Sequence, residues 1–192
     1  MQPRSHETTK KKRSFSCLRV FVVAFAFLGT DFVAAQTPRL PQPGVRYVPS
    51  PQSVVDAMLE MAHVTSADVV YDLGSGDGRI PITAAQRYGA RGVGIEIEPR
   101  LVAESNDNAK KAHVAERVAF VHGDLFAADV RPATVVTLFL LPRMLEDLLP
   151  TLKRDLRPGA RIVTHGYDFG PSWPPEETRD VSGLTIHLWT IR

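Results

Sequence analysis

Hydrophobic positions from about residue 51 onward follow two alternating periods. Short runs rich in β-branched residues and bounded by turn residues predict strands, whereas apolar positions three and four apart predict helices. The expected strands are 69–72, 91–96, 118–122, 134–139 and 160–164. The expected helices between them are 79–88, 99–112 and 143–156. A further helix opens the region, with Ser50 as N-cap, Pro51 at N1, and an apolar face of Val54, Val55, Met58, Leu59 and Ala62.

The regular alternation of strands and helices indicates an α/β fold. Right-handed crossovers then give a parallel sheet with helices on both faces. The C-terminal stretch differs, because two strand-like runs lie on either side of Ser182 and Gly183. Residues 177–192 therefore predict a hairpin that adds antiparallel strands at one edge of the sheet.

A glycine-rich loop follows the first predicted strand, in the stretch VVYDLGSGDGRI at residues 69–80. Gly74, Gly76 and Gly78 allow a sharp turn and let the backbone approach a ligand with no Cβ in the way. The spacing departs from the dinucleotide fingerprint, which would place its third glycine at Arg79. The two aspartates of the loop would also oppose a pyrophosphate. We therefore expect a ligand with a cationic or hydroxylated face.

Three carboxylates stand at the ends of the first three strands. Asp72 could bind an amine, and Glu96, 24 positions later, could accept both hydroxyls of a ribose. Asp124, just past the third strand, could receive the exocyclic amine of an adenine. Any one of them taken alone is as readily a solvated loop residue. Amine, ribose and adenine together describe S-adenosyl-L-methionine, which we predict as the cofactor.

The N-terminal segment has the three parts of a signal peptide. A basic stretch that includes residues 10–13 precedes a run of nine apolar residues at 20–28, and Val33-Ala34-Ala35 resembles a cleavage site before Gln36. We predict export, to the periplasm or as a secreted protein, with an uncleaved membrane anchor as the alternative. Membrane contact would then occur only through an uncleaved segment. The expected organisation is a signal segment at 1–35, a proline-rich linker at 36–50 and one domain at 51–192.

The charge of the chain depends on that segment. Residues 1–35 hold six of the 23 basic and two of the 21 acidic residues, so without them the formal charge falls from +2 to −2. The remainder shows no electrostatic footprint for nucleic acid, and we predict none as a partner. Cys17 is the single cysteine and lies in the segment, which leaves the domain without a thiol nucleophile or a cysteine metal site.

Several motifs resemble the class I S-adenosylmethionine-dependent methyltransferases: DLGSGDG, GIEIEP, GDLF and LRPGARIV. A narrower set, YVPSP, YDLGSGDGRI, LFLLPRM and LRPGARIVTH, is similar to the small family of lysine methyltransferases that act on adenine nucleotide translocase and the ATP synthase c subunit, with its bacterial relatives. The resemblance implies a Rossmann-like sheet, mostly parallel with a C-terminal antiparallel hairpin. It also implies that the methyl donor is bound by Tyr47, Asp72, Gly74, Ser75, Gly76, Glu96, Asp124 and Leu125.

Methyl transfer needs few catalytic side chains, because the protein mainly aligns the acceptor with the methyl group and excludes water. After the fifth strand, His165 or Asp168 could accept a proton from an amine, although a histidine there is often only a packing residue. The sequence TLFLLPR after the fourth strand lacks the Asn-Pro-Pro-aromatic cluster of adenine and glutamine methyltransferases. Three classes stay open: a methyltransferase acting on a protein lysine or other amine, one acting on a small molecule, and a non-catalytic donor-binding protein.

Overall fold

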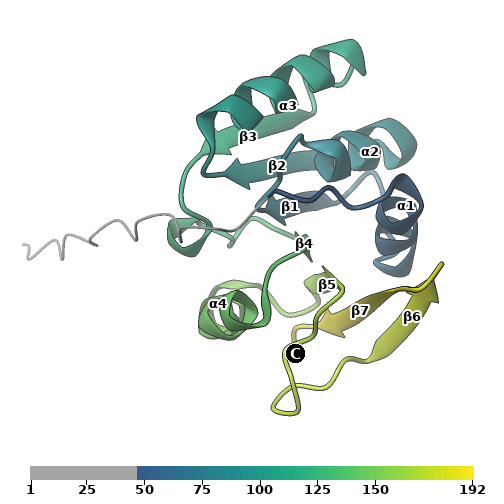
Figure 1. Cartoon of the computed structure of the whole chain (residues 1–192), viewed down its shortest axis with the longest axis vertical. Coiled ribbons are helices and arrows are strands. Elements are labelled where there is room, and N and C mark those ends of the chain that lie inside the picture. The colour runs from purple at the N-terminus through teal and green to yellow at the C-terminus, as the bar shows by residue number, and fades with distance from the viewer. Residues whose placement is uncertain (1–46) are drawn as a thin grey trace, which may run out of the picture. The chain divides into compact units, whose positions relative to one another are not determined.

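The computed structural model describes residues 47–192, which form a seven-stranded sheet covered by helices (Figure 1). The predicted signal segment and residues 36–46 of the predicted linker lie outside the described residues. The strands are β1 (Val69–Leu73), β2 (Arg91–Glu96), β3 (Val118–His122), β4 (Val135–Leu138), β5 (Arg161–His165), β6 (Glu177–Val181) and β7 (Leu184–Thr190). The helices are α1 (Gln52–Met61), α2 (Arg79–Tyr88), α3 (Pro99–Lys111), the 3-10 turn η1 (Leu125–Ala127) and α4 (Pro142–Asp155). None of the described helices is long and apolar enough to cross a bilayer.

The predicted elements are confirmed, with strand and helix ends shifted by one residue or less between positions 69 and 165. The predicted start of the first helix was wrong. Pro51 is the N-cap of α1 and no side chain caps it. Ser50 cannot serve there because its hydroxyl lies 2.9 Å from Nδ1 of His165, 115 residues later in the chain.

The strand order β3-β2-β1-β4-β5-β7-β6 places the first strand beside the fourth in the middle of the sheet. Strands β1 to β5 are parallel, whereas β7 pairs antiparallel with both β5 and β6. The predicted hairpin is therefore confirmed, and its second strand is the one that joins the parallel sheet. The order reverses between β1 and β4, where a sheet of this type leaves a crevice for ligands beyond its carboxyl ends.

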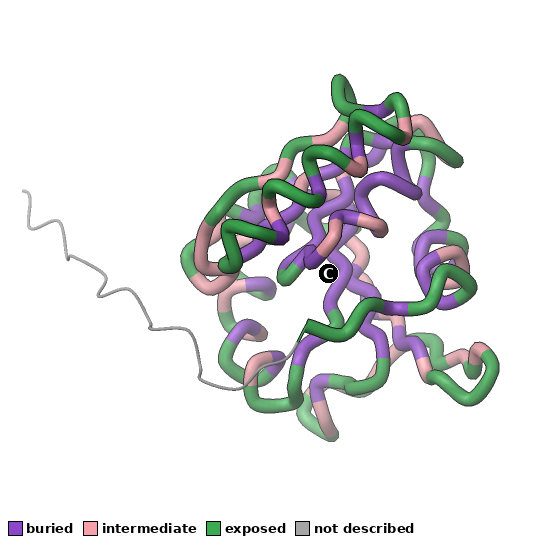
Figure 2. The backbone as a smooth tube through the Cα atoms, turned by 45° about the horizontal axis from the view of Figure 1, so that its top comes forward, coloured by how far each residue is buried: buried purple, intermediate pink, exposed green. Residues whose placement is uncertain are grey.

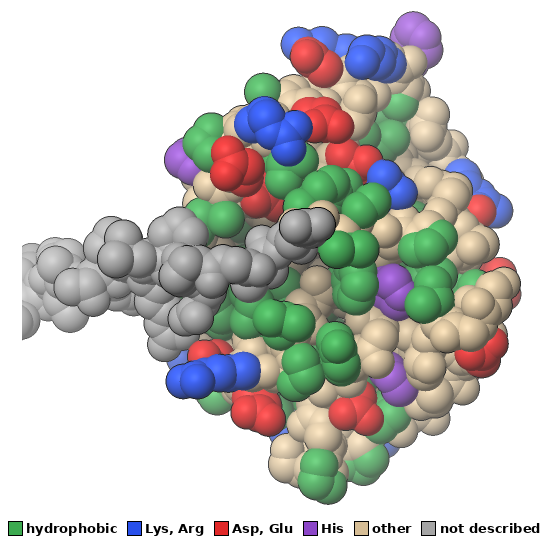
Figure 3. Space-filling view, in the orientation of Figure 1, with side chains coloured by type: hydrophobic (Ala, Val, Ile, Leu, Met, Phe, Trp, Pro, Cys, Tyr) green, Lys and Arg blue, Asp and Glu red, His purple; other side chains and the backbone are tan. Residues whose placement is uncertain are grey.

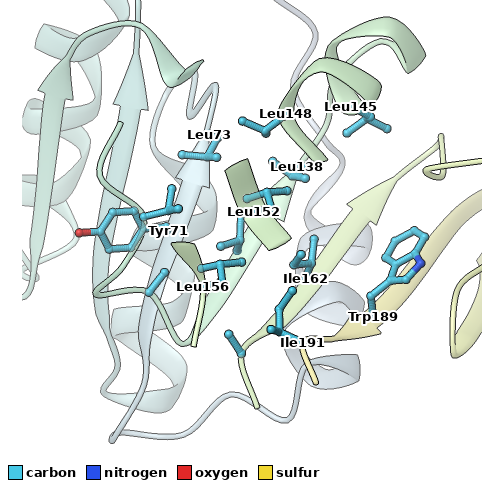
Figure 4. Packing of buried hydrophobic residues seen from close by; sticks show 14 of the residues in the cluster. Tyr71, Leu73, Leu138, Leu145, Leu148, Leu152, Leu156, Ile162, Trp189 and Ile191 are labelled. Atoms are coloured by element: carbon cyan, nitrogen blue, oxygen red, sulfur yellow. The ribbon is translucent and has the colours of Figure 1, made fainter. Parts of the chain in front are cut away.

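Two hydrophobic cores lie on opposite faces of the sheet. Helix α1 packs with α2 against β1, β4, β5 and β7 on one face, and α3 continues this layer over β3. Helix α4 covers the other face with leucines spaced four and three apart, which point toward β4, β5 and β7 (Figure 4). Residues of the inner strands β1, β2, β4 and β5 are mostly buried, whereas the edge strands β3 and β6 have no buried residue and the outer helices alternate between buried and exposed positions (Figure 2). This packing fixes the strand ends that carry the predicted site.

Candidate active site

A cavity of about 680 Å³ lies at the carboxyl ends of the central strands. Seven of the eight residues predicted to bind the methyl donor line it: Tyr47, Asp72, Gly74, Ser75, Glu96, Asp124 and Leu125. The eighth, Gly76, does not line it. The fold therefore brings together side chains from β1, β2, the loop after β3 and the segment before α1, as the strand-end argument predicted.

Two of the three loop glycines serve the packing of the protein. A Cβ on Gly76 would lie 2.1 Å from Cε2 of Tyr47, and one on Gly78 would lie 2.6 Å from Cζ of Phe120. Both glycines also have positive φ angles, of 53° and 80°. The packing therefore requires glycine at positions 76 and 78, and the approach of their backbone to a ligand stays a prediction. Gly74, with a φ of 90°, lines the cavity.

Polar side chains of α3 hold the glycine loop from behind. Ser105 Oγ donates to the carbonyl oxygen of Gly76 at 2.8 Å, and Asn108 Nδ2 donates to the carbonyl oxygen of Asp77 at 3.0 Å. Ser105 is completely buried. Sequence reasoning missed both residues, although a serine on the apolar face of a predicted helix is a signal that its hydroxyl has a specific partner.

Asp72 is a buried carboxylate at the end of β1 with a neutral partner. Thr137 on β4 lies opposite it in register and donates from Oγ1 to Oδ1 at 2.8 Å. Burial raises the pKa of Asp72 to about 7, and the negative charges of Glu96 and Asp77 act in the same direction. Among the described residues no cation pairs with it. A ligand ammonium fits this position, since it would stabilise the ionised carboxylate.

Glu96 and Asp124 combine a structural bond with free acceptor capacity. Glu96 Oε2 accepts from the N–H of Gly76 and Oε1 accepts from the N–H of Glu98, each at 2.9 Å. Asp124 Oδ1 accepts from the N–H of Phe126 at the start of η1, also at 2.9 Å. A carboxylate has about four lone-pair sites, so each can still receive ligand hydroxyl or amine groups. The donor set thus fits the polar groups of S-adenosylmethionine.

Residues 47–50 form a strap over the glycine loop. The Tyr47 ring covers Gly76, and its hydroxyl oxygen lies 3.4 Å from the N–H of Asp77. The Ser50 carbonyl accepts from Arg79 Nη1 at 2.8 Å, while Arg79 is paired with Asp77 at 2.6 Å. The negative charge of this part of the loop is therefore offset within the protein, which leaves Asp72 and Glu96 as the carboxylates that face the cavity from β1 and β2.

His165 and Asp168 lie outside the set of residues that line the cavity. His165 is buried against Phe139, with ring centroids 4.0 Å apart, and burial lowers its pKa, so it is neutral near pH 7. Asp168 is exposed and accepts from the N–H of Gly170 at 2.8 Å. Their catalytic role stays a prediction. The geometry of His165 is that of a positioning residue that anchors Ser50 and the strap.

The model of the ANTKMT methyltransferase domain matches residues 72–177. The chain belongs to this methyltransferase family. A protein-lysine N-methyltransferase of Saccharolobus islandicus is 43% identical over 78% of this chain and 95% of its own length. The ATP synthase c-subunit lysine N-methyltransferase of Mus musculus is 34% identical over 92% of this chain and 71% of its own. The matched residues run from the end of β1 through β5 and so include the strand ends around the cavity.

A solved structure supports the same conclusion for fold and cofactor. The RNA methyltransferase from Salinibacter ruber in complex with S-adenosyl-L-homocysteine has a TM-score of 0.74 and 56% identity, over 75% of this chain and 94% of that one. The family member described here is an S-adenosylmethionine-dependent methyltransferase with a Rossmann-like sheet, as its sequence predicted. The described residues contain no group of three or more histidines, cysteines, aspartates or glutamates arranged to hold a metal ion.

Proposed function

We propose that this methyltransferase transfers a methyl group to the Nζ atom of a protein lysine. The observation that carries the proposal is the charge of the cavity. Six carboxylate side chains line it against three guanidinium groups, namely Asp72, Asp77, Glu96, Glu98, Asp124 and Asp147 against Arg79, Arg100 and Arg143. A cationic side chain is drawn into such a field, whereas a phosphate backbone is repelled. The relatives from Saccharolobus and mouse, both described as lysine methyltransferases, support this acceptor.

The strand order supports a division of the cavity into a donor half and an acceptor half. Glu96 and Asp124 belong to β2 and to the loop after β3, on one side of β1. They suit the ribose and adenine of the donor, and Asp72 at the end of β1 suits its amine. The side beyond β4 is then left for the acceptor. There the wall consists of Phe139, Leu140, Leu141, Arg143, Met144 and Asp147.

This acceptor side suits an amine that must lose its proton. S-Adenosylmethionine, when bound, would supply a sulfonium methyl group whose carbon a neutral amine attacks, so that the N–C bond forms as the C–S electron pair returns to the sulfur of the departing S-adenosylhomocysteine. A free lysine has a pKa of about 10.4, so its ammonium form dominates in water. The apolar side chains of Leu140 and Leu141 disfavour the charged form and lower the amine pKa. The proton passes to solvent at the mouth.

Labelled methyl transfer into a lysate of the source cells tests the acceptor. We expect label in a protease-sensitive fraction, with mass gains of one or more methyl groups on lysine. RNA is the second candidate because the 56% identical structure is described as an RNA methyltransferase. Label that disappears with ribonuclease and not with protease would overturn the proposal. An Asp72→Asn variant, whose binding of the donor should be weakened, serves as the control that transfer depends on the bound donor.

A further inference from the structure

Exposed hydrophobic side chains are concentrated around the cavity. Eight large hydrophobic residues are exposed in the described part of the chain, and five of them line this one cavity: Tyr47, Val48, Ile97, Phe139 and Leu141. Figure 3 shows hydrophobic side chains gathered in the middle of the face that it views, beside the point where the described chain begins. An apolar patch with charged residues around it marks an interaction site.

Three of these residues are left once the donor half of the cavity is set aside. Tyr47 covers the glycine loop, and Ile97 follows Glu96, the carboxylate proposed to bind the donor ribose, so both belong to the donor half. Val48, Phe139 and Leu141 remain, with exposed fractions of 56%, 37% and 48%. They come from two segments, the strap before α1 and the connection from β4 to α4. We call these three residues the acceptor collar.

The collar is held in place before any acceptor arrives. Phe139 packs on the buried ring of His165, which in turn is bonded to Ser50 of the strap that carries Val48. Leu141 is the N-cap residue of α4 and therefore has a fixed backbone direction. Rigid apolar groups lose little entropy on binding, so their burial contributes to affinity.

We propose that the acceptor collar recognises large apolar side chains next to the acceptor lysine in a polypeptide. This rests on the proposed lysine function and adds the kind of sequence that is methylated. A lysine side chain reaches roughly 6 Å from its Cα atom, so the backbone that presents it must pass over the mouth. Its neighbouring side chains then lie against Val48, Phe139 and Leu141. A free small amine would enter the cavity and leave the collar exposed to water.

The test compares two synthetic peptides of equal length and charge, each with a single lysine. In one the lysine is flanked by leucine and phenylalanine, and in the other by serine and glycine. Full burial of even one such side chain predicts a KM lower by roughly tenfold or more for the apolar peptide. Equal KM values would overturn the collar while the lysine function stands. Methylation of neither peptide would overturn the lysine function and the collar with it.

A pair of variants tests whether the collar residues cause the preference for the apolar peptide. Leu141→Ser removes the apolar group and supplies a favourable N-cap residue, so the helix is retained. The KM for the polar peptide divided by the KM for the apolar peptide should fall toward one in this variant. Val121→Ser is the matched control, since Val121 has the same 48% exposure but does not line the cavity, and its ratio should stay that of the wild type. A preference that survives Leu141→Ser and the corresponding Phe139→Ser change refutes the assignment. Binding of S-adenosylhomocysteine, measured on each variant, shows whether the donor site is intact.

Discussion

Replacing Asp72 by asparagine should move stability and donor binding in opposite directions. Asparagine keeps an oxygen that can accept from Thr137 Oγ1, so the hydrogen bond between β1 and β4 is retained. The change removes a buried charge that has no cation beside it among the described residues. The donor-free protein should therefore become more stable, whereas the donor loses the carboxylate that suits its ammonium group.

The magnitude follows from the pKa of Asp72, which burial raises from 3.8 to about 7. Because the folded pKa is the higher one, the folded protein binds more protons than the unfolded chain, and stability falls as pH rises toward 7. Roughly three pKa units correspond to about 4 kcal/mol, as an upper bound on the cost above pH 7. Asp72→Asn should recover part of it, giving a Tm rise of at least about 2 °C near pH 8. Affinity should fall roughly tenfold to a hundredfold, as for a lost hydrogen bond to a charged group.

Two measurements on the same samples check this reasoning. Thermal denaturation without ligand, between about pH 5 and pH 8, should show that the Tm of Asp72→Asn exceeds that of the wild type, and that this difference becomes smaller as the pH is lowered. Calorimetry with S-adenosylhomocysteine should show the loss of affinity. Asp124→Asn is the control, because Asp124 is only partly buried and its change should give no comparable gain. A variant that is less stable than the wild type near pH 8, or that binds the ligand equally well, would refute the argument.

Three further predictions concern the neighbours of this carboxylate. Thr137→Val removes a hydrogen bond that lowers the pKa of Asp72, so this pKa should rise by about one unit. Measured by calorimetry, the affinity for S-adenosylhomocysteine should fall about fivefold near pH 7 and equal that of the wild type near pH 9. Thr137→Ser keeps the hydroxyl and should match the wild type. Gly76→Ala should weaken the same binding by displacing the Tyr47 ring, although Gly76 does not line the cavity, and an added Tyr47→Ala change should weaken it little further because the ring is already displaced. His165→Gln should lower Tm and leave the pH profile of kcat in place; a loss of kcat of about a hundredfold at unchanged Tm would show instead that His165 is a general base.

The sequence predicted the strands, the helices and the carboxylates at the strand ends because these depend on local periodicity and chain order. Side-chain contacts between segments far apart in the sequence could not be predicted in this way. Thr137 meets Asp72 only through the β1–β4 register, across 65 residues, and looks like any other strand threonine. The packing role of Gly76 and Gly78 was missed because the rings of Tyr47 and Phe120 come from elsewhere in the chain.

The hydrogen bonds offered by the carboxylates of the site do not distinguish donor from product. S-Adenosylhomocysteine keeps the amine, the ribose and the adenine, so Asp72, Glu96 and Asp124 can bind it as they bind the donor. Only the sulfonium charge and its methyl group are lost on transfer. Discrimination therefore rests on the charge of the sulfonium, which the acidic cavity favours and for which Phe139, on the proposed acceptor side, offers an aromatic face. Phe139 is also a residue of the proposed acceptor collar, so the proposal gives one side chain two roles, contact with the acceptor polypeptide and contact with the sulfonium. An acceptor that buried Phe139 would remove water from this contact and so strengthen it before the methyl group is transferred.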